Sequence, residues 1–146
     1  MKLLKKESSI IIIGCGSIGS GLASVASNHN YKVTVVDLNE DAFKNLPPDF
    51  FGLTLIGDAT EVATLIAAGI QSADILVTAT NDEDINIMIS QIAACHYKLR
   101  RSITKINNIY KKAICDRLNI EVICPTLLFM NETERVLFDI GEDKAV

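Results

Sequence analysis

The feature that most constrains the fold is a glycine-rich turn, Gly14-Cys15-Gly16-Ser17-Ile18-Gly19, which separates an apolar run from a helical pattern. Residues 9–13 are typical of a buried parallel strand, and residues 17–26 are typical of a helix. A second apolar run, residues 31–36, ends at Asp37. The glycine spacing alone is weak evidence. A strand, this turn, a helix and a carboxylate after the next strand together indicate a dinucleotide-binding α/β unit.

The residue types of this unit predict which nucleotide it binds. Gly14 allows a sharp turn, Gly16 has no Cβ to block a pyrophosphate, and Gly19 allows the helix to pack closely on the sheet. The N–H groups and the positive dipole end of the helix then face the phosphates. Asp37 can accept hydrogen bonds from both ribose hydroxyls and repels a 2′-phosphate, and residues 38–41 include no Arg or Lys. We therefore expect NAD or another adenosine ligand rather than NADP; a glycine-rich turn that binds no ligand is the alternative.

Strand and helix patterns alternate along the chain and predict a single domain, residues 1–146. Strictly alternating units imply parallel strands with right-handed crossovers, and the glycine-rich turn after the first strand implies the strand order 3-2-1-4-5-6. The expected fold class is α/β, a Rossmann-type doubly wound six-stranded parallel sheet. The expected strands are residues 9–13, 32–37, 52–56, 74–78, 102–106 and 121–124. The expected helices include residues 17–26, 40–46, 110–118 and 125 to about 140, with one ending at residue 68 and the longest containing residues 85–92.

The helix patterns also predict caps and core positions. Asp58 and Glu61 have the spacing of a capping box for the helix that ends at residue 68. Asn81 and Asp84 can cap the longest helix. In that helix the apolar residues repeat at helical spacing, and we assign them to the core rather than to a cofactor site: Ile85, Met88, Ile89 and Ile92.

Charge and hydropathy exclude two kinds of partner. The net charge of −4 and the pI near 5.1 argue against a nucleic-acid partner, which requires a basic face. No apolar run approaches the roughly 20 residues needed to cross a bilayer, so we expect no direct membrane insertion. Residues 12–15 resemble a lipoprotein cleavage box, but cleavage there would destroy the glycine-rich turn. We therefore expect a cytoplasmic chain.

The four cysteines show no C-x-x-C pair and no nearby His at metal-ligand spacing, so no metal site is expected. Cys95, Cys115 and Cys124 are expected to be small buried residues. Cys15 lies at a predicted helix N-terminus, which can lower the pKa of its thiol. Redox sensing at Cys15 is therefore a second hypothesis.

Ligands of such sheets bind at the carboxyl ends of the strands, where the strand order reverses. The polar candidates gather there: residues 14–19, Asp37, and residues 58–60, 79–81 and 105–107. Together these segments resemble the N-terminal nucleotide-binding domain of Trk/Ktr-type potassium-uptake regulatory subunits, called RCK, KTN or TrkA-N. The resemblance spans residues 10–138, and its most discriminating segment is Gly57-Asp58-Ala59-Thr60, which ordinary dehydrogenases seldom have. The other matching segments are residues 11–19, 35–39, 79–82, 105–108 and 125–126.

This resemblance implies a regulatory domain of a potassium uptake system, peripheral to the inner face of the membrane through a membrane potassium transporter subunit. Such domains bind NAD, NADH, ATP, ADP or AMP, assemble as homodimers or higher rings, and gate transport by ligand-dependent conformational change. Many members carry Arg at the position of Ser17, so Ser17 favours NAD or NADH, with ATP, ADP or AMP as alternatives.

The resemblance also implies a set of cofactor-binding residues. By position, Gly14, Gly16 and Gly19 would cradle the phosphates, and Asp37 would hold the adenosine ribose. Asp58, Ala59 and Thr60 would border the adenine, and Thr80 and Asn81 would meet the distal half of the ligand. Lys105 would approach the ligand from the fifth strand, and the set is completed by Cys15, Ser17, Ile18 and Leu38.

We expect a binding module rather than an enzyme. A dehydrogenase needs a substrate-holding region and usually a His, Tyr or Lys placed for proton transfer. His29 and His96 lie at the ends of predicted helices, away from the predicted crevice. A small NAD-dependent oxidoreductase and a free-standing nucleotide-binding scaffold are the alternatives.

The last predicted helix, residues 125–140, carries apolar residues on more than one face. A helix at the edge of one sheet buries a single stripe, so the second face requires another partner. We expect at least a homodimer through this helix; packing of both faces within one subunit is the alternative. The residues concerned are Leu127, Leu128, Phe129, Met130, Val136, Leu137, Phe138 and Ile140.

Overall fold

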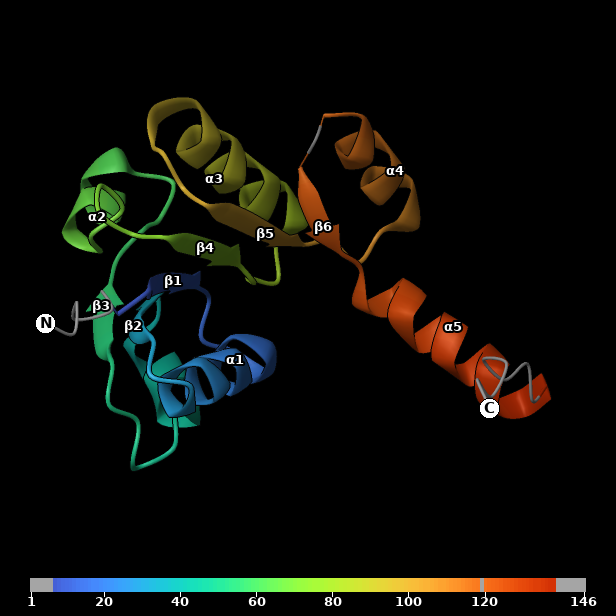
Figure 1. Cartoon of the computed structure of the whole chain (residues 1–146), viewed down its shortest axis with the longest axis horizontal. Coiled ribbons are helices and arrows are strands. Elements are labelled where there is room, and N and C mark those ends of the chain that lie inside the picture. The colour runs from blue at the N-terminus through green and yellow to red at the C-terminus, as the bar shows by residue number, and fades with distance from the viewer. Residues whose placement is uncertain (1–6, 119, 139–146) are drawn as a thin grey trace, which may run out of the picture.

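The strands form one parallel sheet in the order β3-β2-β1-β4-β5-β6, which confirms the predicted fold class and strand order (Figure 1). The structure is a computed structural model that describes residues 7–118 and 120–138. The strands are β1 (Ser9–Ile13), β2 (Lys32–Asp37), β3 (Leu53–Ile56), β4 (Ile75–Thr78), β5 (Arg101–Lys105) and β6 (Glu121–Ile123). The helices are α1 (Ser17–Asn28), the short 3₁₀ helix η1 (Glu40–Asn45), α2 (Val62–Ala67), α3 (Glu83–His96), α4 (Ile109–Arg117) and α5 (Pro125–Phe138).

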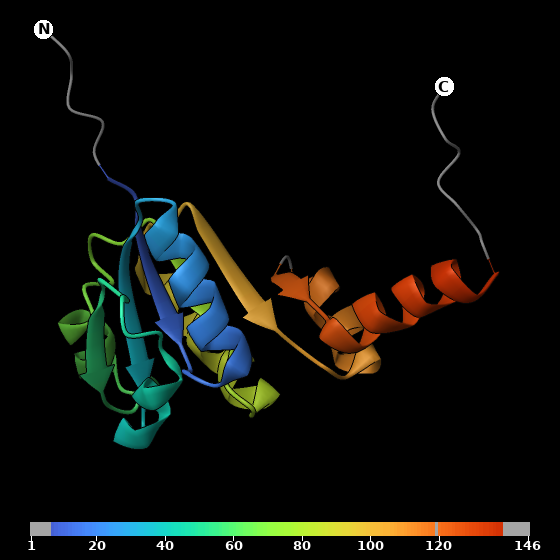
Figure 2. The ribbon, with the colours of Figure 1, turned by 90° about the horizontal axis from the view of Figure 1, so that it is seen from below.

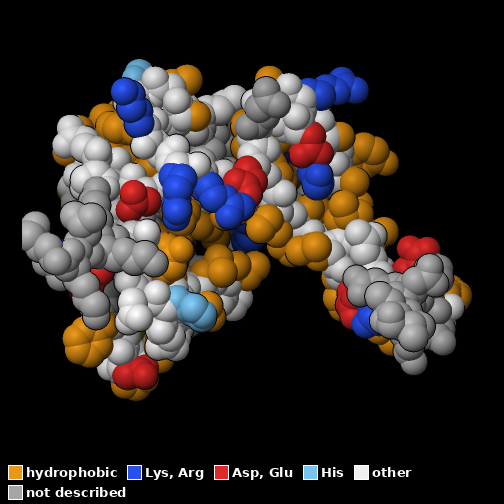
Figure 3. All heavy atoms as spheres, viewed as in Figure 1, with side chains coloured by type: hydrophobic (Ala, Val, Ile, Leu, Met, Phe, Trp, Pro, Cys, Tyr) orange, Lys and Arg blue, Asp and Glu red, His pale blue; other side chains and the backbone are white. Residues whose placement is uncertain are grey.

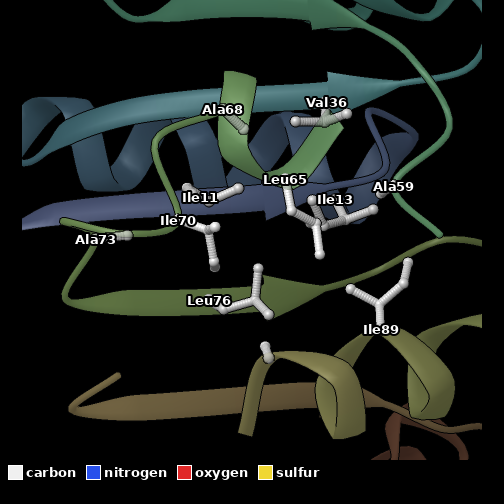
Figure 4. Packing of buried hydrophobic residues seen from close by; sticks show 11 residues of the cluster. Ile11, Ile13, Val36, Ala59, Leu65, Ala68, Ile70, Ala73, Leu76 and Ile89 are labelled. Atoms are coloured by element: carbon white, nitrogen blue, oxygen red, sulfur yellow. The ribbon is translucent and has the colours of Figure 1, made fainter. Parts of the chain in front are cut away.

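One face of the sheet packs against α2 and α3. Figure 4 shows Ile11, Ile13 and Leu76 of the strands gathered with Leu65 of α2 and Ile89 of α3. These side chains are almost completely buried. Burial of such side chains contributes about 1.5–3 kcal/mol each relative to exposure, so this cluster holds the two helices on the sheet.

The opposite face of the sheet packs against α1 and η1. Ile12, Val35 and Val77 lie in this second cluster with Ala23 of α1 and Cys15. Successive strand residues point to opposite faces, so a strand covered on both sides is apolar at every position. This is why β1 is an unbroken run of isoleucines after Ser9.

The central strands end level with one another at one edge of the sheet. Ile13 pairs in register with Val36 of β2 and with Thr78 of β4, and Asp37 pairs with Ile56 of β3. The turns that follow β1, β2, β3 and β4 therefore open on the same edge, where the sequence places the candidate ligand residues.

Helix α5 leaves the sheet instead of packing on it (Figures 1 and 2). None of its residues is buried, and Phe129 is 74% exposed. Apolar side chains also gather on the surface over α4 and β6 beside the start of α5 (Figure 3), where Ile114, Leu118 and Ile123 are exposed. The described part of α5 therefore has an apolar surface that its own sheet does not cover. Ile140, predicted in the same helix, lies outside the described residues.

Two of the predicted helix caps are wrong. Asp58 accepts hydrogen bonds from the backbone N–H (2.9 Å) and hydroxyl (2.6 Å) of Thr60, and α2 starts with no side-chain cap bond at Glu61. Helix α3 is capped by Asp82, whose carboxylate accepts from the backbone N–H groups of residues 84 and 85, and not by its neighbour Asn81 or by Asp84. In both places, several short polar side chains compete for one cap within a few residues.

The cysteine predictions hold for two residues out of three. Cys115 and Cys124 are buried, but Cys95 is exposed near the end of α3. Ala93 occupies the buried position of that turn, and a residue two places further along a helix points to the opposite side.

Candidate functional site

The glycine-rich turn brings the start of α1 directly over the end of β1. Gly14 has φ +98, a left-handed conformation that favours glycine, and its N–H donates to the Val36 carbonyl oxygen at 2.8 Å. A Cβ on Gly19 would overlap the carbonyl oxygen of Gly14, so glycine is required for the helix to pass this close. A Cβ on Gly16 would meet nothing within 4 Å. The fold therefore requires glycine at Gly14 and Gly19, whereas the space beside Gly16 is open.

Helix α1 begins without a side-chain cap. Gly16 occupies the cap position and has no side chain to accept a hydrogen bond, and Gly16, Ser17 and Ile18 are all exposed. The first N–H groups of a helix have no partner within the helix, and they carry the positive end of its dipole. This end of α1 is therefore a ready-made site for an anion.

The carboxylate of Asp37 holds the turn in place. One of its oxygens accepts from the Cys15 N–H at 2.7 Å and the other accepts from the Asn39 N–H at 2.8 Å. The amide of Asn45 in turn donates to the Cys15 carbonyl oxygen at 2.9 Å. Each carboxylate oxygen can accept more than one hydrogen bond, so Asp37 retains capacity for a ligand.

The environment of Cys15 overturns its predicted reactivity. Its side chain is fully buried under the turn, and burial together with the nearby charge of Asp37 raises the pKa of the thiol. The prediction of a lowered pKa at the helix N-terminus is wrong, because the thiol points into the core rather than toward the free N–H groups. Cys15 therefore fits its place as a small buried residue.

The turn after β3 presents a second carboxylate at the same edge. Hydrogen bonds from the hydroxyl and then the N–H of Thr60 lower the pKa of Asp58, which keeps it ionised. Ala59 between them is buried. The hydrogen bonds between Asp58 and Thr60 thus stabilise this turn and hold the Asp58 carboxylate at the edge of the sheet.

The turn after β4 is held by the start of α3. Asn86 is fully buried and bonds to three polar groups of Thr80. Its amide oxygen accepts from the Thr80 N–H and the Thr80 hydroxyl, and its amide nitrogen donates to the Thr80 carbonyl oxygen. The same nitrogen donates to the carbonyl of Lys105 at 3.0 Å. One turn earlier, Glu83 accepts from the N–H groups of Asn107 and Asn108.

These turns enclose a pocket of about 540 Å³ at the carboxyl edge, within the range of small-molecule sites. It is lined by many of the predicted residues: Gly14, Gly16, Asp37, Leu38, Asp58, Ala59, Thr60, Thr80 and Asn81. Ala79, which belongs to a segment that the sequence placed at this edge, also lines it. The sequence did not single out the other lining residues as ligand contacts: Ile13, Val36, Asn39, Ala42, Gly57, Asp82, Ile85, Met88 and Ile89.

Of the α3 apolar stripe, Ile85, Ile89 and Ile92 pack in the core as predicted, whereas the prediction is wrong for Met88. Ile89 is buried, but it lines the pocket together with Ile85 and Met88, and Met88 is 41% exposed. The first turns of α3 rise past the edge of the sheet, so their inner face meets the pocket. The apolar residues of such a helix repeat at the same spacing in the core and beside the pocket. The sequence pattern therefore does not show where the core ends and the pocket begins.

The remaining predicted residues do not line this pocket. Cys15 and Gly19 are buried under the turn, while Ser17 and Ile18 lie exposed at the start of α1 beside it. Lys105 follows Thr104, whose hydroxyl faces α3, so the Lys105 side chain lies on the other face of the sheet. Partial burial there lowers the pKa of the Lys105 amine.

A second hollow of about 560 Å³ lies at the opposite edge of the sheet. Its lining includes Ser9, Tyr31 and Phe51, near the amino ends of the first strands. The two hollows are nearly equal in volume, so volume does not indicate which of them binds a ligand. The free end of α1 and the strand carboxyl ends favour the first one, because ligands of doubly wound sheets bind there.

Over residues 7–118 and 120–138, no group of His, Cys, Asp and Glu side chains is placed to hold a metal ion. No helix in this part of the chain is long and apolar enough to cross a bilayer. His29 bonds to the Val25 carbonyl at the end of α1, and His96 lies in the last turn of α3. Neither lines the pocket at the carboxyl edge.

Relatives of this chain include Trk system potassium uptake proteins. The Trk system potassium uptake protein TrkA of Streptomyces coelicolor is 25% identical over 134 residues, which cover 92% of this chain and 60% of that protein. The protein of the same name from Halomonas elongata is 32% identical over 108 residues, which cover 74% of this chain and 23% of that protein. The chain thus spans less than two thirds of the length of either relative.

Solved structures with the same fold include the RCK domain of GsuK, with a TM-score of 0.78 and 22% identity over 94% of this chain and 30% of that one. The Shewanella denitrificans Kef CTD in its AMP-bound form has a TM-score of 0.74 and 24% identity over 93% of this chain and 83% of that one. GsuK bound to ADP and the GsuK channel bound to NAD match with TM-scores of 0.75 and 0.67, over 94% and 84% of this chain and 36% and 22% of those chains.

These likenesses show a shared fold, and the family follows from the sequence itself. The model of the TrkA-N domain matches residues 10–125, well over half of the chain. The chain therefore belongs to the TrkA-N domain family.

Proposed function

We propose that this chain binds NAD or NADH in the pocket at the carboxyl edge and serves as the nucleotide-sensing domain of a potassium uptake system. One observation carries the proposal: the uncapped start of α1 and the carboxylate of Asp37 open beside the same pocket. An anion-binding helix end next to a ribose-binding carboxylate is the arrangement that a dinucleotide requires.

In this proposal each turn holds one part of the ligand. The open space beside Gly16 receives the pyrophosphate, and Asp37 accepts hydrogen bonds from the adenosine ribose. Asp58 and Thr60 border the adenine, and the Thr80 turn meets the distal half. The Kef CTD bound to AMP and the GsuK structures bound to ADP and NAD support an adenine nucleotide of some kind.

The charge of the pocket supports NAD over ATP. The charged residues that line it are Asp37, Asp58 and Asp82, and its lining includes no Lys or Arg. Carboxylates around a pocket repel polyanions, and low-dielectric walls strengthen the effect. NAD carries a cationic nicotinamide and less negative charge than ADP or ATP. A binding panel has to compare NAD and NADH with the alternatives, which are ADP, ATP and AMP.

A sensing role fits the lining better than a catalytic one. The described lining of the pocket consists of carboxylates, amides, hydroxyls, small residues and apolar side chains, without a His, Tyr or Lys to move a proton. The Trk potassium uptake proteins among the relatives support a membrane potassium transporter as the partner. In this account, nucleotide occupancy changes the conformation that the domain presents to that transporter on the cytoplasmic side.

We further propose that two copies pair through α5. Leu128, Phe129 and Leu137 are each more than half exposed on this helix, and Ile123 is 46% exposed at the edge of the sheet beside it. Exposed apolar surface of this extent is typical of an interaction site. A second α5 offers the same surface, which suits a two-fold symmetric contact.

A ligand panel tests the binding proposal directly. Thermal unfolding is followed with NAD, NADH, NADP, AMP, ADP and ATP, each at increasing concentration. A ligand at 100 times its Kd stabilises the fold by about 2.7 kcal/mol, which raises Tm by roughly 5–10 °C for a chain of this size. We expect NAD or NADH to give the largest shift and NADP little. Equal shifts with NAD and NADP would contradict the role of Asp37, and oxidation of NADH with small carbonyl compounds would favour the oxidoreductase.

A further inference from the structure

Asn86 is a buried side chain whose hydrogen-bonding capacity is fully used. Its amide oxygen accepts from the N–H of Thr80 at 3.0 Å and from the hydroxyl of Thr80 at 2.7 Å. Its amide nitrogen donates to the carbonyls of Thr80 at 3.1 Å and Lys105 at 3.0 Å. Asn86 has no exposed surface, so it does not line the pocket.

These contacts fix the turn that follows β4. The N–H, the hydroxyl and the carbonyl of Thr80 all point back to Asn86, and the Asp82 N–H donates to the same hydroxyl at 3.2 Å. A turn held at three points has one orientation, and the residues that remain free to meet a ligand, such as Asn81, are presented on its outer side. The fourth contact joins this turn to the end of β5.

We propose that Asn86 is a positioning residue for the nucleotide site, one that sets the Thr80–Asn81 turn against the distal half of the ligand without touching it. This inference rests on the proposed function, and it assigns to a buried side chain of α3 part of the selection between a dinucleotide and a mononucleotide. Asparagine is required because the position needs two donors and an acceptor on one short side chain.

The test compares a ligand that reaches the turn with one that does not. NAD has a distal half, whereas AMP ends at the phosphate that the start of α1 binds. In Asn86→Ala we expect the affinity for NAD to fall about tenfold, the equivalent of one misplaced hydrogen bond, and the affinity for AMP to change less than about threefold. Calorimetry on the full chain gives both values.

A loss of buried hydrogen bonds also destabilises the fold, so a second variant and a control are needed. Asn86→Asp keeps the size of the side chain and its acceptor contacts to Thr80 but loses donors, and it decides the question if Asn86→Ala does not fold. The control is Ser90→Ala, one turn further along α3. Ser90 is 2% exposed and bonds to the hydroxyls of Thr78 and Thr104, away from the turn.

The ratio of NAD affinity to AMP affinity gives the answer. The proposal predicts a lower ratio in the Asn86 variants and the wild-type ratio in Ser90→Ala. It is overturned if folded Asn86 variants keep the wild-type ratio, or if Ser90→Ala lowers the ratio equally. If the wild-type chain binds neither NAD nor AMP, the proposed function itself fails and this inference fails with it.

Discussion

Asp37 is the last residue of β2, and this position gives it one structural task and one proposed task in ligand binding. Its carboxylate fixes the N–H of Cys15 at 2.7 Å and so shapes the glycine-rich turn before any ligand arrives. A preformed turn reduces the ordering cost of binding. Substitution of Asp37 would therefore affect the turn as well as the proposed ribose contact, which makes Gly16 the cleaner position for a test of the site.

Gly16→Val is expected to remove NAD binding and to leave the fold intact. A Cβ at this position would meet nothing within 4 Å and the backbone is extended (φ −74, ψ −164), so we expect the unfolding free energy to change by about 0.5 kcal/mol or less. The same side chain fills the space that the pyrophosphate needs. Calorimetry with NAD and a urea titration measure the two effects.

Gly21→Val is the matched control for that variant. Like Gly16, Gly21 has open space beside it, but it lies within α1, one turn past the start of the helix. We expect it to bind NAD as the wild type does. NAD affinity that survives in folded Gly16→Val would refute the assignment of the phosphate site.

At the residue scale, the sequence pointed to the candidate site through its conspicuous residue types, and it did not point to Asn86. Gly14, Gly16 and Asp37 stand out because glycine and carboxylate have few alternative explanations in a strand–turn–helix unit. Asn86 lies inside a helical pattern, where an asparagine is ordinarily a surface residue. Only the fold shows that its neighbours are the Thr80 turn and the end of β5.

Among the elements, α3 connects the pocket turn to the C-terminal part of the chain. Glu83 in its first turn accepts from two backbone N–H groups and pairs with Lys111 of α4 at 3.1 Å. The hydrogen bond from the Asn108 N–H is the largest of the effects that lower the pKa of Glu83, followed by those from Lys111 and the Asn107 N–H. The ionised carboxylate thus holds the loop before α4.

This contact predicts how stability depends on pH. Because the folded-state pKa of Glu83 lies below the ordinary value of 4.5, its contribution is present above that pH and is lost as pH falls through the lowered pKa. Glu83→Gln should cost about 1 kcal/mol at pH 7, and its unfolding free energy should approach that of the wild type in acid. Urea unfolding between neutral and acid pH measures the difference. A difference that stays constant across the range would contradict the assigned contact.

Helix α5 gives the prediction for assembly. Phe129→Glu combined with Leu137→Glu places charge on surface that two copies would bury, and we expect it to convert a homodimer into a monomer in analytical ultracentrifugation. Asn131→Glu, on an exposed polar residue of the same helix, should remain dimeric. A wild-type chain that stays monomeric at micromolar concentration, or a dimer that persists in the double variant, would place the pairing surface elsewhere or remove it.

The elements themselves were largely predictable, and the strand ends were predicted to within one residue, but the helix caps were not. The alternation of apolar strands with helical patterns determined the type and order of every element, because covered parallel strands and amphipathic helices have distinct periods. The caps were mistaken where Asn81, Asp82 and Asp84 compete within four positions. One hydrogen bond decides such a competition, and spacing alone does not reveal it.

In the whole molecule, the sheet and α3 lie between the pocket at the carboxyl edge and the projecting helix α5. The strand order that reverses between β1 and β4 creates the pocket. The sequence predicted that edge because the polar segments follow the strands. It did not predict the apolar lining from α3, because Met88 and Ile85 have the pattern of core residues.

The most direct test is an NMR titration of the ¹⁵N-labelled chain with NAD, which shows where the ligand lies as well as whether it binds. We predict that the amide signals of Gly16, Ser17 and Ile18 shift most, together with those of Asp37 and Asn81, while signals at the opposite edge, near Ser9 and Tyr31, stay in place. Shifts confined to that opposite edge, or no shifts at saturating NAD, would contradict the nucleotide site.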